Sequence, residues 1–283
     1  MNTTSGMYAL RSRLASVFVY VLLSATAIIV LLPVVWIVIS SLNPGDTLLS
    51  TSLWPKALSL DHYRYLFLKT DYPLWYMNTL KIATANMFLS TFLIVTSAYA
   101  FSRFRFPGRR AGLMAMLVLQ MFPSFMGMVA IYILLLQLGL LDNLWGLVLV
   151  YAGGSIPFGA WLVKGYFDGI PRSLEEAARI DGATNTQIFF KVMFPLSYPI
   201  LTFIMLNNFI GPWMDFIFAR LVLRSNAHKT LAIGLFEMVT GTGNTKFTTF
   251  AAGAVLVAIP ITLLFLFLQK YLIEGLTAGA NKG

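Results

Sequence analysis

One charged segment organises this sequence: Ile170-Pro171-Arg172-Ser173-Leu174-Glu175-Glu176-Ala177-Ala178-Arg179-Ile180-Asp181-Gly182-Ala183. Apolar stretches long enough to cross a membrane lie on both sides of it. Because charged side chains are costly to place in hydrocarbon, the segment must face water. We call it the charged island and expect it to meet a partner on that side of the membrane.

The composition is that of a membrane protein: of 283 residues, 58% are hydrophobic and only 11% charged, against about 25% charged in soluble proteins. The net charge is +9, but the Lys and Arg residues are scattered among apolar runs, which favours topology signals over nucleic-acid binding. The chain has no cysteine, and its two histidines, His62 and His228, have no second ligand at metal spacing. We therefore expect no metal site, no catalytic residues and no bound nucleic acid.

Six stretches are long and apolar enough to span a bilayer, which predicts an all-α integral membrane fold with six transmembrane helices. The first has too long an apolar core for a cleaved signal peptide, so we expect it to remain as a helix. The predicted spans are Val17 to Ser40, Asn78 to Ser102, Ala111 to Leu136, Leu144 to Lys164, Leu196 to Ala219 and Phe247 to Lys270.

The distribution of arginine predicts the topology, because Lys and Arg in short loops resist translocation. Arg11 and Arg13 precede the first span and four arginines occupy the link 103–110, whereas the turn 137–143 has none. Both termini, the link and the loop 165–195 are thus predicted to be cytoplasmic. The expected organisation is a tail 1–16, a first span 17–40, an extracytoplasmic segment 41–77, a core 78–270 with an outer loop 220–246, and a cytoplasmic tail 271–283.

The outer segment 41–77 is rich in Tyr and Trp, which favour the headgroup layer. Interfacial anchoring and an aromatic platform for sugar both fit this composition. In the outer loop, glycines predict a turn over 239–244 that brings backbone close to another surface.

The charged island has the signals of a short helix. Ser173 followed by Glu176, after Pro171, predicts a capping box at its start. Gly182 is placed to end the helix in the left-handed conformation. Thr184 or Asn185 then caps a second short helix, which stops at Pro195. An amphipathic linker on the headgroups is the alternative, although such linkers prefer Lys and Arg to an acidic start.

The island also resembles a known family. Glu176-Ala177-Ala178, then Gly182 after three residues, then Val192-Met193-Phe194-Pro195 after nine, is similar to the EAA loop of binding-protein-dependent ABC importers. Val192 and Phe194 depart from the family's Ile and Leu but remain apolar. Residues 179–183 resemble the carbohydrate branch, and the tail 274–283 is similar to the end of the six-span maltose/maltodextrin permease subunits.

This resemblance implies a type I permease fold in a prokaryotic plasma (inner) membrane. A second permease subunit would complete the path, two ATPase subunits would lie below, and an extracytoplasmic binding protein would deliver an oligosaccharide. The chain has no Gly-x4-Gly-Lys-Ser/Thr motif, so ATP and magnesium would be held by the partner ATPase and this chain would carry no cofactor. The implied ATPase-coupling residues are Glu175, Glu176, Ala177, Ala178, Asp181 and Gly182.

Other implied sites face outward or lie within spans. The tip Gly241, Thr242, Gly243 and Asn244 would reach into the binding protein, or form a plain connecting loop. Asn207, Asn208, Trp213 and Asp215 would contact sugar or the partner permease, although helix–helix hydrogen bonding is the commoner use of such Asn residues. The tail 271–283 would extend between the ATPase subunits or be disordered. Pro123 and Pro260 are predicted to bend the third and sixth spans.

The leading hypothesis is a permease subunit of an ATP-driven importer for maltodextrin-type or galacto-oligosaccharide-type sugars. An ion-coupled secondary transporter acting without an ATPase is the alternative; it predicts acidic pairs or broken half-helices near the midplane. Apart from the terminal Lys164 and Lys270, the spans offer only Lys81 and Asp215, both near predicted outer ends. A membrane-embedded enzyme would need a nucleophile–base or metal constellation, and the sequence contains none.

Overall fold

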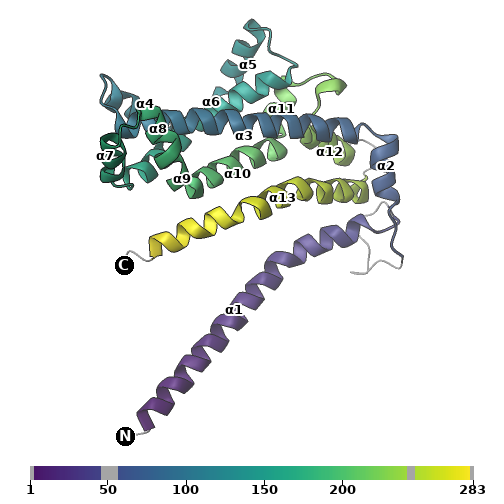
Figure 1. Ribbon diagram of the computed structural model, residues 1–283. Coiled ribbons are helices and arrows are strands. Elements are labelled where there is room, and N and C mark those ends of the chain that lie inside the picture. Colours follow the sequence, from purple (N-terminus) through teal and green to yellow (C-terminus); the bar gives the residue numbers. More distant parts are fainter. Residues whose placement is uncertain (1–2, 46–56, 241–245, 281–283) are drawn as a thin grey trace. The chain divides into compact units, whose positions relative to one another are not determined.

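The computed structural model describes residues 3–240, except 46–56, and residues 246–280, and the described chain consists of helices joined by turns and short links (Figure 1). It divides into two compact units, residues 1–69 with 238–256, and residues 70–237 with 257–283. The elements are α1 Thr3–Ser41, α2 Asp61–Lys69, α3 Tyr72–Arg103, α4 Arg109–Met121, η1 Ser124–Gly127, α5 Met128–Gln137, α6 Leu144–Asp168, α7 Arg172–Ile180, α8 Asn185–Ile188, η2 Phe189–Met193, α9 Phe194–Leu196, α10 Tyr198–Met214, α11 Ile217–Val222, η3 Asn226–His228, α12 Leu231–Thr240 and α13 Phe247–Ala280.

The first unit joins the end of α1, the helix α2 and the start of α13. His62 of α2 is buried, and its Nδ1 lies 3.0 Å from the Thr249 hydroxyl while its Nε2 lies 2.9 Å from the Asn43 carbonyl. Ser41 and Tyr63 add a hydroxyl pair at 2.7 Å. Residues 13–38 of α1 are exposed and strongly apolar, as expected of a helix whose surroundings are lipid or another subunit.

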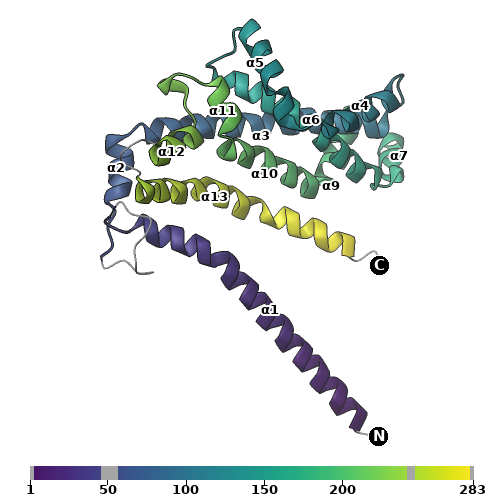
Figure 2. The same cartoon turned by 180° about the vertical axis from the view of Figure 1, so that it is seen from behind.

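The second unit is built on α3, which packs against α6 and α10 (Figures 1 and 2). Near the end of α3, the buried residues Ile94, Ala98 and Tyr99 share one core with Val163 and Phe167 of α6. Nearer the start of α3, Ile82 packs with residues of α5, α6 and α11 in a second core. Small and β-branched side chains in these cores let neighbouring helices approach closely, as is typical of membrane helix packing.

A glycine sets the distance between α3 and α6. A Cβ placed on Gly159 would lie 2.4 to 2.9 Å from three side-chain carbons of Ile94. Ile94 is fully buried, so its side chain has no room to move aside. The contact of Gly159 with Ile94 therefore requires glycine, whereas Gly165 of the same helix has no atom within 4 Å of such a Cβ.

The six-span all-α fold is confirmed, although two of the spans are bent. In the part of the chain that the structure describes, four helices are long and apolar enough to cross a membrane, and the count reaches six when each bent helix pair is taken as one span. The third span breaks between α4 and α5 with a bend of 92°, next to Pro123, which has no N–H to continue a helix. A second bend of 80° separates α8 to α9 from α10 at Ser197.

Several boundaries differ from the predicted ones. The first helix begins at Thr3, within the predicted tail 1–16, and α3 begins at Tyr72, six residues before the predicted start of its span at Asn78. The last helix continues to Ala280, whereas the span was expected to end at Lys270, and Pro260 lies inside it without ending it. Polar flanks are compatible with helix once they leave the apolar layer, so hydropathy alone places helix ends poorly.

The Asp142 carboxylate ties the turn before α6 to the segment after α11. Asp142 accepts hydrogen bonds from the backbone N–H groups of Arg224, at 2.9 Å, and Ser225, at 3.0 Å. Burial raises the pKa of the Asp142 carboxyl, but hydrogen bonds from Ser225, Arg224 and His228 outweigh this and lower the pKa to about 2. Asp142 therefore stays ionised at neutral pH and holds the two segments together.

Replacing Gly159 with Ala should destabilise the protein, because overpacking a filled contact costs about 1–3 kcal/mol. We expect Gly159→Ala to lower the thermal unfolding midpoint of the detergent-solubilised protein, measured by scanning fluorimetry. Gly165→Ala is the matched control and should leave the midpoint unchanged or raise it, because Ala favours helix over Gly. In an Ile94→Ala background, Gly159→Ala should lower the midpoint less than it does in the wild-type chain; an equal loss in both backgrounds would show that the contact with Ile94 is not the cause.

Candidate functional site

The charged island forms the helix α7, which starts earlier than predicted. Pro171 is the N-cap and no side chain caps the helix. The Pro171 carbonyl already accepts the Leu174 N–H at 3.3 Å, so the first turn closes before Ser173 could act as a cap. The predicted capping box of Ser173 and Glu176 is therefore wrong.

The end of α7 is as predicted. Gly182 adopts the left-handed conformation with φ +82°. Its N–H donates to the Arg179 carbonyl at 3.0 Å, and the Ala183 N–H donates to the Ala178 carbonyl at 2.9 Å. This pair of bonds is a Schellman motif, which satisfies carbonyls that the end of a helix leaves free.

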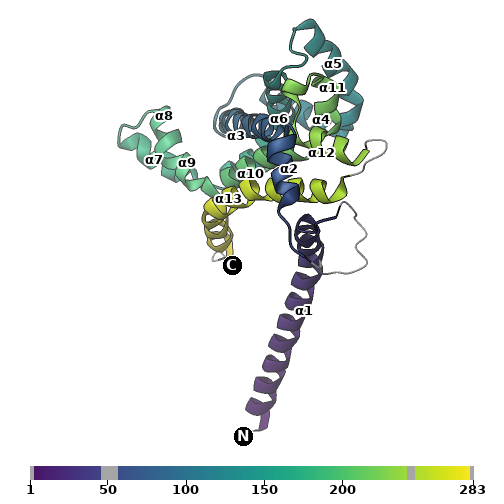
Figure 3. The same ribbon diagram turned by 90° about the vertical axis from the view of Figure 1, so that its right-hand side faces the viewer.

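The predicted cap of the next helix is confirmed at Thr184, where it forms a capping box with Gln187. The Thr184 hydroxyl accepts the Gln187 N–H at 3.3 Å, and the Gln187 side chain accepts the Thr184 N–H at 2.8 Å. The chain then runs through α8 and a π-helical turn, η2, to α9 and the bend at Ser197. Figure 3 shows α7, α8 and α9 standing to one side of α3 and α6.

The two neighbouring glutamates of α7 have different surroundings. Among the nine residues of α7, only Glu175 is buried, and its carboxylate forms an ion pair with Arg103 at the end of α3. Both side chains are almost fully enclosed, with 6% of Arg103 and 3% of Glu175 exposed. Glu176 is exposed, because successive helical residues point about 100° apart.

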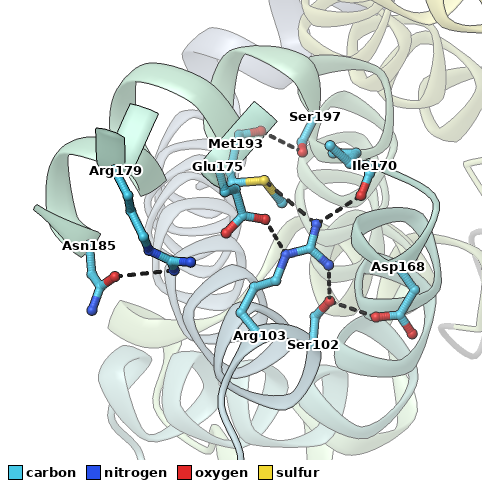
Figure 4. A network of polar contacts seen from close by, with 9 residues as sticks. All are labelled: Ser102, Arg103, Asp168, Ile170, Glu175, Arg179, Asn185, Met193 and Ser197. Carbon is cyan, nitrogen blue, oxygen red and sulfur yellow. Dashed lines mark hydrogen bonds and ion pairs between the residues drawn. The ribbon is translucent and has the colours of Figure 1, made fainter. Parts of the chain in front are cut away.

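Arg103 makes further contacts within the same cluster (Figure 4). Its Nη2 donates to the Ile170 carbonyl at 3.1 Å, and its Nη1 donates to the Ser102 hydroxyl at 2.9 Å. Ser102 in turn donates to Asp168, the last residue of α6, at 2.6 Å. One guanidinium thus connects the end of α3, the link before α7 and α7 itself, and Ser102 extends the cluster to α6.

The predicted coupling residues therefore fall into two groups. Glu175 points into the chain, so its carboxylate is held by Arg103 and is not presented to a partner. The other five, Glu176, Ala177, Ala178, Asp181 and Gly182, are exposed or half-buried. Ile180 beside them is 86% exposed. Small side chains, two carboxylates and one apolar side chain make this face suitable for close docking of another protein.

Three of the four predicted substrate-path residues line one cavity of about 710 Å³ between α3, α5, α6, α10 and α11. They are Asn207, Asn208 and Asp215, and the structure adds Asn86 and Tyr151. Trp213 does not line the cavity; it is buried against Tyr76, with ring centroids 5.3 Å apart.

Most polar groups of this cavity are already engaged. The Asn86 amide donates to the backbone carbonyl of Asn208 at 2.7 Å, which joins α3 to α10. Asp215 accepts hydrogen bonds from the Tyr151 hydroxyl and from the backbone N–H groups of Phe218 and Ala219, the latter two at 3.1 Å. Asn208 and Asp215 thus hold helices together.

Asn207 differs from these residues in its exposure. It is exposed, and its amide donates only to the Phe203 carbonyl of its own helix, at 2.9 Å. Among the described residues its side-chain oxygen accepts no hydrogen bond. Asn207 therefore has a free acceptor beside the cavity.

Sequence reasoning missed Arg103, Asn86 and Tyr151 as site residues. Arg103 looked like one of four topology signals, and nothing in the sequence distinguishes it from Arg105. Asn86 lies within a predicted span, and the rule that polar residues in spans are functional candidates could have identified it. The predicted tip Gly241, Thr242, Gly243 and Asn244 lies outside the described residues.

The position of the cap can be tested by two matched substitutions. Thr184→Ala should speed amide hydrogen exchange over residues 185–190 about fivefold, because losing a cap costs about 1 kcal/mol. Ser173→Ala should leave exchange in α7 unchanged, since Ser173 caps nothing. Faster exchange in α7 for Ser173→Ala would contradict the structure; mass spectrometry of deuterated peptides measures both.

Comparison with known proteins gives the family. The family model for the binding-protein-dependent transport system inner membrane component matches residues 90–277. The galactooligosaccharides transport system permease protein GanQ of Bacillus subtilis is 44% identical, covering 94% of this chain and 95% of that protein. The maltodextrin transport system permease protein MdxG of the same organism is 39% identical, covering 93% and 95%.

A solved structure of a bacterial ABC transporter has a chain of similar fold. A crystal structure of a bacterial ABC transporter that imports the acidic polysaccharide alginate contains a chain with a TM-score of 0.79 and 28% identity, covering 92% of this chain and 97% of that one. The chain described here belongs to the family of binding-protein-dependent transport system inner membrane components, and it is a multi-pass permease subunit of a bacterial ABC sugar transporter.

Proposed function

We propose that this chain is one of two permease subunits of an ATP-driven importer for oligosaccharides of the galacto-oligosaccharide or maltodextrin kind. The names and high coverage of GanQ and MdxG support this substrate class. Import would depend on an extracytoplasmic binding protein that delivers the sugar. The segment Gly241 to Asn244 is the proposed contact for that protein.

The exposed face of α7 is the observation that carries the proposed mechanism. The face presents Glu176, Ala177, Asp181 and Gly182 while the opposite side of α7 is anchored by Glu175. We place α7 and both termini in the cytoplasm, because the arginine-rich link 103–110 follows the same end of α3. An ATPase subunit that holds ATP and magnesium would dock there, two such subunits serving the two permeases.

Reversing the charge of Glu176 tests the docking. We expect the docked ATPase to present a cationic group to Glu176. Glu176→Lys should therefore lower sugar uptake and sugar-stimulated ATPase activity of the assembled transporter by about tenfold or more, because like charges across an interface cost several kcal/mol. Membrane insertion should persist. Asp71→Lys is the control, since Asp71 is exposed and its side chain makes no capping bond. Normal uptake by Glu176→Lys would refute the coupling role, and uptake by this chain alone under an ion gradient would instead favour a secondary transporter.

Asn207 is the residue we propose for direct contact with the sugar. Sugar hydroxyls both donate and accept hydrogen bonds, and Asn207 offers a free acceptor beside a cavity of about 710 Å³. Asn208 and Asp215 would shape the cavity, because Asn208 is buried and the Asp215 carboxylate is engaged by Tyr151 and by two backbone N–H groups.

Removing the Asn207 side chain should weaken sugar handling without disturbing assembly. We expect Asn207→Ala to raise the KM for uptake about two- to tenfold, the value of one neutral hydrogen bond, with ATPase binding unchanged. Gln120→Ala is the matched control, because Gln120 is an exposed amide that also donates to the carbonyl four residues earlier. An unchanged KM across a panel of oligosaccharides would remove Asn207 from the path.

A further inference from the structure

The ion pair between Arg103 and Glu175 joins two helices that are far apart in sequence. Arg103 precedes Glu175 by 72 residues and ends α3, the central helix of its unit. The covalent neighbours of α7 are α6, through residues 169–171, and α8, through residues 181–184. The ion pair therefore gives α7 a direct connection to α3 that the order of the chain does not provide.

The chemistry of this connection is unusual for an anchor. A buried ion pair adds little stability compared with apolar side chains of similar size, because both charges lose their hydration. An apolar contact, however, has no preferred direction and can slide. A guanidinium bonded at once to Glu175, to the Ile170 carbonyl and to Ser102 fixes both distance and direction.

Apart from Glu175, the side chains of α7 do little to hold this helix against the rest of the unit. Glu175 is its one buried residue, and Leu174 and Ile180 are 45% and 86% exposed. Ala178 packs against the neighbouring core from a half-buried position. A force applied to the exposed face of α7 thus reaches the fold mainly through Glu175, Ala178 and the two chain links.

We propose that Arg103 is a positioning residue that passes the displacement of α7 to α3. When the docked ATPase moves α7, the ion pair moves the end of α3 with it, and α3 carries the motion to the cavity lined by Asn86. This inference rests on the proposed coupling function. It differs from it in assigning Arg103 and Glu175 to transmission within this chain, and Glu176 to docking.

The test separates transmission from docking. In the full transporter reconstituted in vesicles, Arg103→Gln should still co-purify with the ATPase and hydrolyse ATP, but sugar moved per ATP should fall roughly tenfold, within the usual range of coupling between sites. Arg105→Gln is the matched control, since Arg105 is exposed in the same link and loses the same charge. If Arg103→Gln moves as much sugar per ATP as the wild type, the proposal is overturned. If the wild-type chain does not co-purify with the ATPase, the proposed function is overturned instead.

A second variant serves if Arg103→Gln does not fold, because removing one partner leaves a buried charge. The chain has no cysteine, so Arg103→Cys with Glu175→Cys places two unique, uncharged thiols in it. Joining them with a bifunctional methanethiosulfonate reagent should restore sugar moved per ATP, and cleaving the link with dithiothreitol should abolish it again. Equal transport in the joined and cleaved forms, or loss of transport on joining, would overturn transmission through this pair.

Discussion

A charge that leaves water must find a partner, and Arg103 and Glu175 meet this requirement for each other. With 6% and 3% of their side chains exposed, neither could be buried alone without a large penalty. Their pairing decides which side of α7 faces inward. It thereby decides which residues are left at the surface, Glu176, Ala177 and Asp181 among them.

The same requirement shapes the cavity near the other end of the unit. The Asp215 carboxylate lies at the break between α10 and α11, where free backbone N–H groups of Phe218 and Ala219 meet it. Tyr151 adds a third donor from α6. Breaks in membrane helices expose polar backbone, and this carboxylate satisfies it without water. Asn207, which we propose contacts the sugar, is exposed and keeps a free side-chain acceptor.

Rigid and yielding parts of the unit are therefore distinct. α3 and α6 pack so closely at Gly159 and Ile94 that no methyl group fits between them. α7, by contrast, has one buried side chain and is held by a directional ion pair. A helix with few buried side chains can be displaced, and its directional ion pair joins it to two tightly packed helices that move as one body.

The sequence by itself determined the membrane class, the six apolar stretches, the family and the left-handed end of α7 at Gly182. The family came from the resemblance of the motif that runs from Glu176 to Pro195. The other properties depend on composition, on local periodicity or on one residue's backbone freedom, all of which are local. The sequence also predicted Thr184 as a possible cap of the second short helix, which the structure confirms. It wrongly predicted a capping box at Ser173, because Pro171 closes the first turn of α7. Only the tertiary structure decided which of the adjacent residues Glu175 and Glu176 is buried and which arginine it meets. That choice depends on how far α7 rotates against α3, and a contact between residues 72 positions apart leaves no local signal in a single sequence.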